Sequence, residues 1–214
     1  MSLALVQDER QLEADGEGRA AALWSVDQLR GSLTELSQDG PHGATLVFAC
    51  QLLAQAQRQG DYVSWISARR EPVYGPDLRA WGLDLGSLVW VQTDSDEHSA
   101  RSAERLLQSG GFGLVVIDCQ SRDVGERQIP MAMQGRLIKL AQMHDAGVLF
   151  LSDKSEHVPS LSSMIGLRVV AGWSDRRGMD VQCLLRAIKD KRHGPGWSHS
   201  LSCRIPEGWA LCGD

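Results

Sequence analysis

One stretch, ELSQDGPHGAT at residues 35–45, limits the possible folds of this chain more than any other. The residues before it, Ser32–Leu36, predict a short strand, and the residues after it carry apolar side chains at helical spacing. A strand, a loop of small residues and a helix are the context of a phosphate-binding P-loop, G-x-x-x-x-G-K-[ST]. The stretch therefore predicts an α/β fold with a phosphate-loop position after its first strand.

Residues 38–45 keep only part of the P-loop pattern. Gln38 replaces the first Gly, and Gly43 keeps the second. Ala44 stands where the pattern has its Lys, and Thr45 keeps the hydroxyl on the metal side. The missing Lys is the group that brings positive charge to the β- and γ-phosphates, and a methyl group cannot replace it. We therefore predict a degenerate nucleotide site that holds no cofactor and no metal.

Charge and composition narrow the class of protein. No apolar run approaches the ~20 residues of a membrane-spanning helix, and no secretion signal opens the chain, so we expect a cytoplasmic protein without membrane contact. The five cysteines lack C-x-x-C spacing and are expected to be reduced thiols. The net charge of −5 argues against a general nucleic-acid binder, but residues 168–204 carry eight Arg or Lys against three Asp. This asymmetry indicates either an acidic or nucleic-acid partner or a solvated rim.

The rest of the chain predicts one domain after an acidic N-terminal segment. Residues 1–22 are acidic and interrupted by Gly16 and Gly18, which predicts a mobile segment, and residues 23–214 follow as a single domain. From residue 167 onward three strands follow one another without helices, which predicts an antiparallel edge on a mostly parallel sheet flanked by helices. The predicted strands are 32–36, 61–67, 88–91, 114–117, 147–151, 167–171, 181–188 and 200–205, and the predicted helices are 24–29, 46–60, 77–81, 96–109 and 131–143.

Ligands of such sheets bind beyond the carboxyl ends of the parallel strands. Ser67, Asp118 and Asp153 each follow a predicted strand, and the degenerate loop does too. We expect all of them at one rim. A carboxylate such as Asp118 can hold Mg²⁺, although capping of loop N–H groups is the commoner role for it.

Several runs resemble the RecA recombinase core, and the resemblance covers residues 31–205. GSLTELSQDGPHGATLVFACQLLAQAQRQGDYVSWISA is similar to its opening strand, P-loop and helix, and LLQSGGFGLVVID is similar to its Walker B strand. LFLSD looks like the strand that ends in a nucleotide sensor, and CLLRAIKDKRHGPG looks like the late strand that ends in paired lysines. Within the superfamily, LLQSGGFGLVVID and the closing IPEGWAL look most like ImuA, a RecA-like accessory protein encoded with an error-prone polymerase pair.

The resemblance also implies which functional positions are lost. The P-loop Lys corresponds to Ala44, and the carboxylate that activates water in RecA falls near Arg69, a cation that cannot act as a base. The sensor Gln falls at Asp153, so only Thr45 and Asp118 match. The resemblance therefore implies a RecA-like core that is not an enzyme.

The late basic strand is the candidate contact surface. In RecA its paired lysines reach the nucleotide of the neighbouring subunit, and the resemblance carries this role toward Lys189 and Lys191 here. We hypothesise a partner or DNA contact at Arg186, Lys189, Lys191 and Arg192, with a solvated strand end as the alternative. The predicted function is protein–protein contact in DNA damage tolerance and SOS-type mutagenesis, with RecA or ImuB-type polymerase subunits as partners and only weak or indirect DNA contact. Two alternatives stay open, a SulA-like cell-division inhibitor and a residual nucleotide-binding ATPase.

Overall fold

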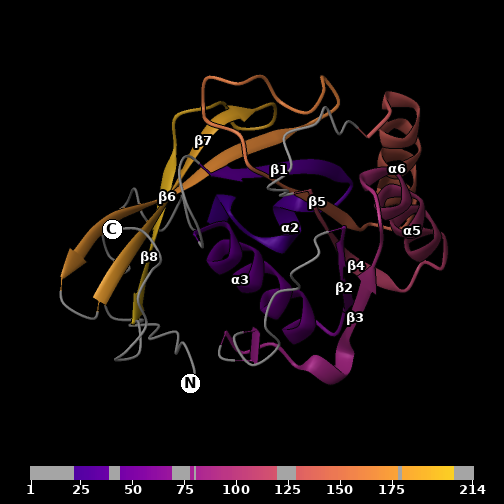
Figure 1. Cartoon of the computed structure of the whole chain (residues 1–214), viewed down its shortest axis with the longest axis horizontal. Coiled ribbons are helices and arrows are strands. Elements are labelled where there is room, and N and C mark those ends of the chain that lie inside the picture. The colour runs from indigo at the N-terminus through magenta and orange to yellow at the C-terminus, as the bar shows by residue number, and fades with distance from the viewer. Residues whose placement is uncertain are drawn as a thin grey trace.

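The computed structural model describes residues 22–38, 44–68, 78–79, 81–119, 129–177 and 180–204. Strands and helices alternate through most of the chain, and three strands close it (Figure 1). The elements are α2 (Val26–Leu29), β1 (Ser32–Gln38), α3 (Ala44–Arg58), β2 (Tyr62–Ser67), the 3-10 turn η2 (Leu85–Ser87), β3 (Leu88–Gln92), α5 (Asp96–Gln108), β4 (Phe112–Asp118), α6 (Met131–Met143), β5 (Gly147–Ser152), β6 (Leu167–Arg177), β7 (Asp180–Asp190) and β8 (Ser198–Arg204).

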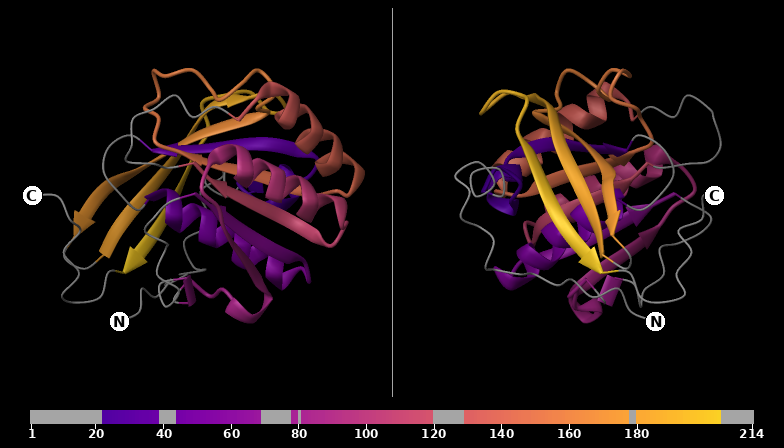
Figure 2. Two further views of the ribbon diagram at one scale, coloured as in Figure 1. Left: turned by 45° about the vertical axis from the view of Figure 1, so that its right-hand side comes forward. Right: turned by 90° about the vertical axis from the view of Figure 1, so that its left-hand side faces the viewer.

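One eight-stranded sheet organises the molecule, with the strand order β3-β2-β4-β5-β1-β6-β7-β8 (Figure 2). The pairings from β3 to β6 are all parallel, whereas β6–β7 and β7–β8 are antiparallel. The predicted mostly parallel sheet with an antiparallel C-terminal edge is confirmed. β1 lies inside the sheet, between β5 and β6, and its carboxyl end leads into the degenerate loop.

The antiparallel edge is longer than its sequence predicted. β6 runs to Arg177 and not only to Ala171, because it keeps pairing with β7 after its pairing with β1 ends at Ala171. β7 and β8 accompany it, and the three strands extend past the rest of the sheet (Figure 2). The mostly apolar run 167–171 identified the inner part of β6, but the polar outer part, SDRR, gave no strand signal.

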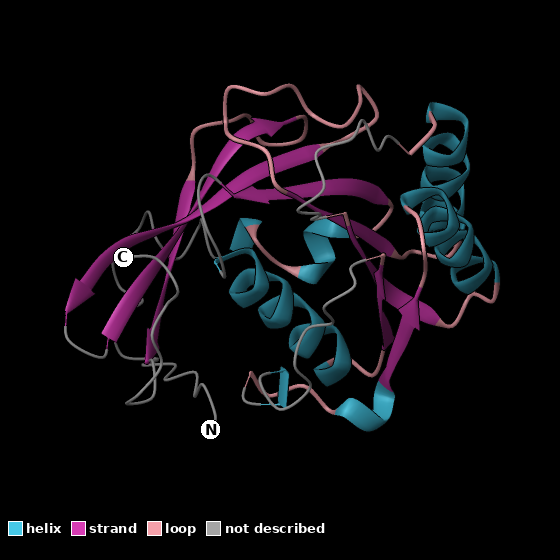
Figure 3. Ribbon diagram, viewed as in Figure 1, coloured by secondary structure: helices cyan, strands magenta, loops and turns pink. Residues whose placement is uncertain are grey.

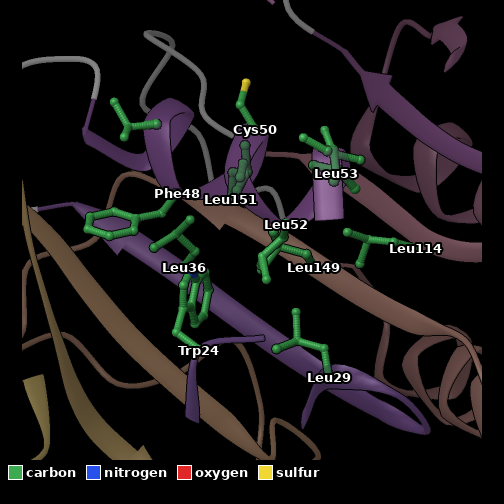
Figure 4. Packing of buried hydrophobic residues seen from close by; sticks show 14 of the residues in the cluster. Trp24, Leu29, Leu36, Phe48, Cys50, Leu52, Leu53, Leu114, Leu149 and Leu151 are labelled. Carbon is green, nitrogen blue, oxygen red and sulfur yellow. The ribbon is translucent and has the colours of Figure 1, made fainter. Parts of the chain in front are cut away.

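Helices cover both faces of the sheet (Figure 3). α2 and α3 pack on one face around Leu36, Phe48, Leu149 and the buried Trp24 (Figure 4). α5 and α6 pack on the other face around a second cluster that includes Leu33. Every described residue of β5 is buried, and so is β4 apart from its first residue, as predicted for central strands covered on both sides.

A hydroxyl cap and two glycines mark helix ends. The Ser95 side chain accepts a hydrogen bond from the His98 N–H and caps α5. Gly60 and Gly110 follow α3 and α5 with φ of 90° and 71°, the left-handed region that favours glycine. Of the predicted helix 77–81, only Leu78 and Arg79 are described as helical. Among the described residues no helix is long and apolar enough to cross a membrane.

Candidate functional site

The carboxyl ends of β2, β4, β5 and β1 meet at one rim, as predicted. Ser67 and Asp118 are register partners, and the Ser67 hydroxyl donates to the Asp118 carboxylate at 3.4 Å. Asp118 is only 1% exposed. β5 separates its strand from β1, so the rim places Asp118 two strands away from the degenerate loop.

Gln38 connects the degenerate loop to the neighbouring strand end. It is the last residue of β1, and its amide Nε2 donates to Asp153 Oδ1 at 3.1 Å. Its Oε1 accepts a hydrogen bond from Thr45 Oγ1, also at 3.1 Å. The hydroxyl that the P-loop pattern assigns to a metal is therefore engaged by the side chain that replaces the first Gly. The sequence predicted that Gln38, Thr45 and Asp153 lie at the same rim, but it did not indicate this bridge.

Ala44 opens α3 and belongs to the core. Its side chain is 2% exposed and packs in the cluster between α3 and the sheet. Its methyl group provides no charge for a phosphate, as the sequence indicated. Gly43, Arg69 and the N-terminal residues 1–21 lie outside the described part of the chain.

A buried ionic network lies on β1, and sequence reasoning missed it. Glu35 is fully buried and faces Arg168 of β6, which is 2% exposed; the distance from Arg168 Nε to Glu35 Oε2 is 3.8 Å. Glu35 also accepts hydrogen bonds from Ser152 Oγ and from the Leu161 N–H, both at 2.9 Å. Lys154 Nζ lies 4.0 Å from Glu35 Oε1. A charged residue inside a predicted strand was the only signal that could have indicated the network.

The network holds the segment between β5 and β6 against the sheet. The Arg168 guanidinium donates to the backbone oxygens of Ser155 and Val158, and the Glu35 carboxylate holds Leu161. The backbone of this segment is thus tied by two buried side chains, and its Glu156 pairs with Arg186.

The four predicted contact residues do not form one free surface. Arg186 lies in the middle of β7 and is exposed, whereas the other three lie at the end of β7 and in the turn after it. Lys189 Nζ donates to the Ser162 oxygen at 3.4 Å, and Lys191 Nζ donates to the Ser163 oxygen at 2.6 Å. Arg192 donates to the oxygens of Gln28 and Arg30 at 2.8 and 3.1 Å.

Because β7 is antiparallel to β6, its end lies at the amino ends of the parallel strands. Asp190 is the register partner of Leu167, at the start of β6, whereas Gln38 pairs with Ala171 further along that strand. The basic turn therefore lies at the amino ends of the parallel strands, and the degenerate loop lies at their carboxyl ends. Within a single chain the structure does not bring the two predicted sites together.

Burial, nearby charge and hydrogen bonds shift the pKa values of Lys189 and Asp190 at the end of β7. Burial is the main cause that lowers the pKa of Lys189, and the charge of Lys191 lowers it further. Burial acts to raise the pKa of Asp190, but hydrogen bonds from the His193 N–H, the Trp197 indole and the Arg192 N–H lower it below its ordinary value. The ionised Asp190 thus anchors the turn, and Trp197 is one of its hydrogen-bond donors.

Of the cysteines whose side chains are described, Cys50 and Cys183 lie in the core. Cys119 follows β4 and is partly buried. Burial is the main cause that raises its pKa well above the ordinary value, with Asp96 and Asp118 adding to the effect. A thiol held neutral in this way is a poor nucleophile, which argues against cysteine chemistry at the rim.

The sheet order, the strand–loop–helix after β1 and the antiparallel β7–β8 edge define the class of the molecule: the fold is a RecA-like core. The sequence is 31% identical to RecA of Acholeplasma laidlawii over 133 residues, 58% of this chain and 39% of that protein. It is 30% identical to RecA of Thermotoga maritima over 149 residues, 65% of this chain and 40% of that protein. RecA of Borreliella afzelii is 29% identical over 135 residues, 58% of this chain and 35% of that protein.

These similarities are distant and partial. The chain spans about two fifths of the length of the curated relatives it matches, and no protein-family model matches it. Together with the fold they support a place in the RecA-like superfamily.

Proposed function

We propose that this chain is a non-catalytic RecA-like protein of the ImuA type, which acts by contact with other proteins in DNA damage tolerance. Its partner is RecA itself or a subunit of an error-prone polymerase complex of the ImuB type. The observation that carries the proposal is the Gln38 bridge, which engages Thr45 and Asp153 at 3.1 Å each in a loop that already lacks its Lys.

The chemistry of the rim supports the non-catalytic part. Phosphoryl transfer depends on cations that neutralise charge on the phosphates and on a group that orients the attacking water. Ala44 provides no cation, and Thr45 donates its hydrogen bond to Gln38. A metal held by Asp118 alone would leave most of the phosphate charge uncompensated.

The segment between β5 and β6 supports contact with protein in preference to single-stranded DNA. Sequence-independent binding of a single strand uses a basic groove lined by stacking aromatics. The segment 153–166 contains no aromatic ring other than that of His157, and Glu35 and Arg168 fix its backbone. Its Glu156 opposes the charge of Arg186.

Nucleotide titration tests the first part of the proposal. We expect no binding of a fluorescent ATP analogue at millimolar concentration, and no ATP turnover when single-stranded DNA is added. Turnover above a buffer blank would contradict the non-catalytic assignment and would favour the residual ATPase.

Binding to purified partners tests the second part. The immobilised chain is exposed to RecA of the same bacterium, free or assembled on single-stranded DNA, and separately to the error-prone polymerase subunit. The test variant reverses the charge of Lys189, Lys191 and Arg192, and the control variant reverses three exposed cations of α5 and α6, Arg101, Arg105 and Lys139. We expect weaker binding only for the test variant, most clearly at low salt. No binding of the wild type to either partner, or equal losses for both variants, would contradict the proposal.

A further inference from the structure

A second candidate binding site lies at the amino ends of the parallel strands, on the side of the sheet away from the degenerate loop. A cavity of about 180 Å³ opens where β1 and β6 begin and β7 ends. Its apolar lining comes from Leu23, Ile138, Met164 and Leu167, and its polar lining includes the turn Asp190–His193. The two kinds of lining come from segments far apart in sequence, α2, α6 and the β7–β8 turn.

The cations at this cavity are held in place by the fold. Lys191 and Arg192 are exposed, and their hydrogen bonds to the backbone oxygens of Ser163, Gln28 and Arg30 fix their positions. An ammonium group carries three N–H donors and a guanidinium group five, so these bonds use only part of each group's capacity. A fixed cation loses little side-chain freedom when it binds an anion.

The acidic residue in the lining offsets only one of these two charges, and its hydrogen bonds turn it away from the opening. Asp190 accepts hydrogen bonds from the N–H groups of Arg192 and His193 at 2.8 and 2.9 Å through one oxygen, and from the Trp197 indole at 3.0 Å through the other. Its carboxylate is directed into the turn. The opening therefore combines an apolar floor with two fixed cations.

The size of the cavity selects the kind of group that fits. Pockets for drug-sized ligands measure roughly 300–1,000 Å³, so this cavity is smaller than the usual site for a ligand of that size. A dry apolar cavity of about 150 Å³ accepts a benzene-sized group. The floor therefore matches one apolar side chain, and the fixed cations match carboxylates beside it.

From this geometry we propose that the cavity binds a peptide segment of the partner in which an apolar side chain is flanked by acidic residues. The apolar side chain enters between Ile138, Met164 and Leu167, and the acidic groups pair with Lys191 and Arg192. This inference rests on the proposed function for the existence of a partner. The site itself is defined by the cavity and its charges.

Titration with short peptides tests the site without any partner protein. The probe is Ac-Asp-Leu-Asp-NH₂, and the observable is the NMR shift of the Ile138 and Met164 methyl groups. The first control peptide, Ac-Asn-Leu-Asn-NH₂, lacks the charges, and the second, Ac-Asp-Gly-Asp-NH₂, lacks the apolar side chain. We expect millimolar binding of the probe and about tenfold weaker binding of each control, since each loses one of the two recognition elements.

Two glycine variants localise the binding. A Cβ at Gly166 would meet nothing closer than the Leu33 oxygen at 3.7 Å, so Gly166→Leu fits the backbone and places its side chain in the cavity that Gly166 lines. Gly172 lies on β6, the strand that follows Gly166, and a Cβ there would have no neighbour within 4 Å, so Gly172→Leu is the matched control. We expect Gly166→Leu to abolish the probe's shifts and Gly172→Leu to keep them.

The wild-type titration alone can overturn the proposal. Absence of methyl shifts with the probe, or equal shifts with all three peptides, would contradict it whatever the glycine variants do. Probe binding together with failure of every partner assay would refute the proposed function and leave the site standing. Partner binding without probe binding would refute the peptide site and leave the proposed function standing.

Discussion

Acid should destabilise this chain strongly, because the edge strand β8 carries a buried histidine. His199 lies on β8, is 8% exposed, and its ring centroid is 6.1 Å from that of Phe48 on α3. Its Nε2 has no hydrogen-bond partner among the described residues. Burial lowers the pKa of His199 from 6.5 to about 4, and no neighbouring charge contributes to the shift.

The direction and size of the effect follow from this pKa. The folded state favours the neutral ring, whereas the unfolded chain binds a proton near pH 6.5. The stability linked to His199 is therefore fully present above pH 6.5 and is lost as the pH falls from 6.5 toward 4. One pKa unit corresponds to about 1.4 kcal/mol, so the whole interval removes about 3 kcal/mol from the free energy of unfolding.

Urea unfolding followed by tryptophan fluorescence measures this loss. The wild type is compared with His199→Phe, which cannot titrate and places an aromatic ring beside Phe48. His157→Gln is the control, because the His157 side chain is 86% exposed. Carboxylates titrate in all three proteins, so the difference between profiles isolates the histidine. We expect the wild type and the control to lose about 3 kcal/mol more than His199→Phe between neutral pH and pH 4. Parallel profiles for the wild type and His199→Phe would refute the reasoning.

Three further changes test other features. Glu35→Ala leaves Arg168 buried without its carboxylate and should cost about 3–5 kcal/mol in urea unfolding, whereas Glu35→Leu with Arg168→Met should cost much less; equal losses would contradict a buried ion pair. Ala44→Lys alone should not restore ATP turnover, because the Gln38 bridge is unchanged, and hydrolysis by this variant would show that bridge to be unimportant. Lys191→Glu loses one hydrogen bond to a backbone oxygen and Arg192→Glu loses two, so Arg192→Glu should lower the unfolding free energy by about 1 kcal/mol and Lys191→Glu by less; the reverse order in thermal melts would contradict these contacts.

The fold was largely predictable because local patterns agreed with the sheet. The predicted strands 114–117 and 147–151 lie within β4 and β5, and the predicted helices 46–60 and 96–109 overlap α3 and α5. Ser67 and Asp118 were placed at one rim because parallel strands share their carboxyl edge, and the register confirms it. The direction of β7 was predicted as well, from the absence of helices between the last three predicted strands.

The side-chain contacts of the candidate site were less predictable, because they join residues far apart in the chain. The Gln38–Asp153 bond spans 115 positions, and the bond from Glu35 to Leu161 spans 126. Periodicity reports which face of an element is apolar and does not report which polar groups meet across a sheet. The hydrogen bonds from the cations at the end of β7 to Ser163 and Gln28 were not visible in sequence for the same reason.

The position of β1 between β5 and β6 also affects how the chain is made. During translation β1 is complete once Gln38 has been added. Roughly 110 further residues must be added before Gly147, where β5 begins. At ~5–20 residues per second, β1 waits about 5–20 s before either neighbouring strand has been synthesised. Throughout that interval the backbone of β1 has no strand to pair with, while its apolar side chains already exist. The nascent chain is thus most exposed to aggregation before β5 emerges, and truncations that end ahead of Gly147 should be the ones that depend most on chaperones.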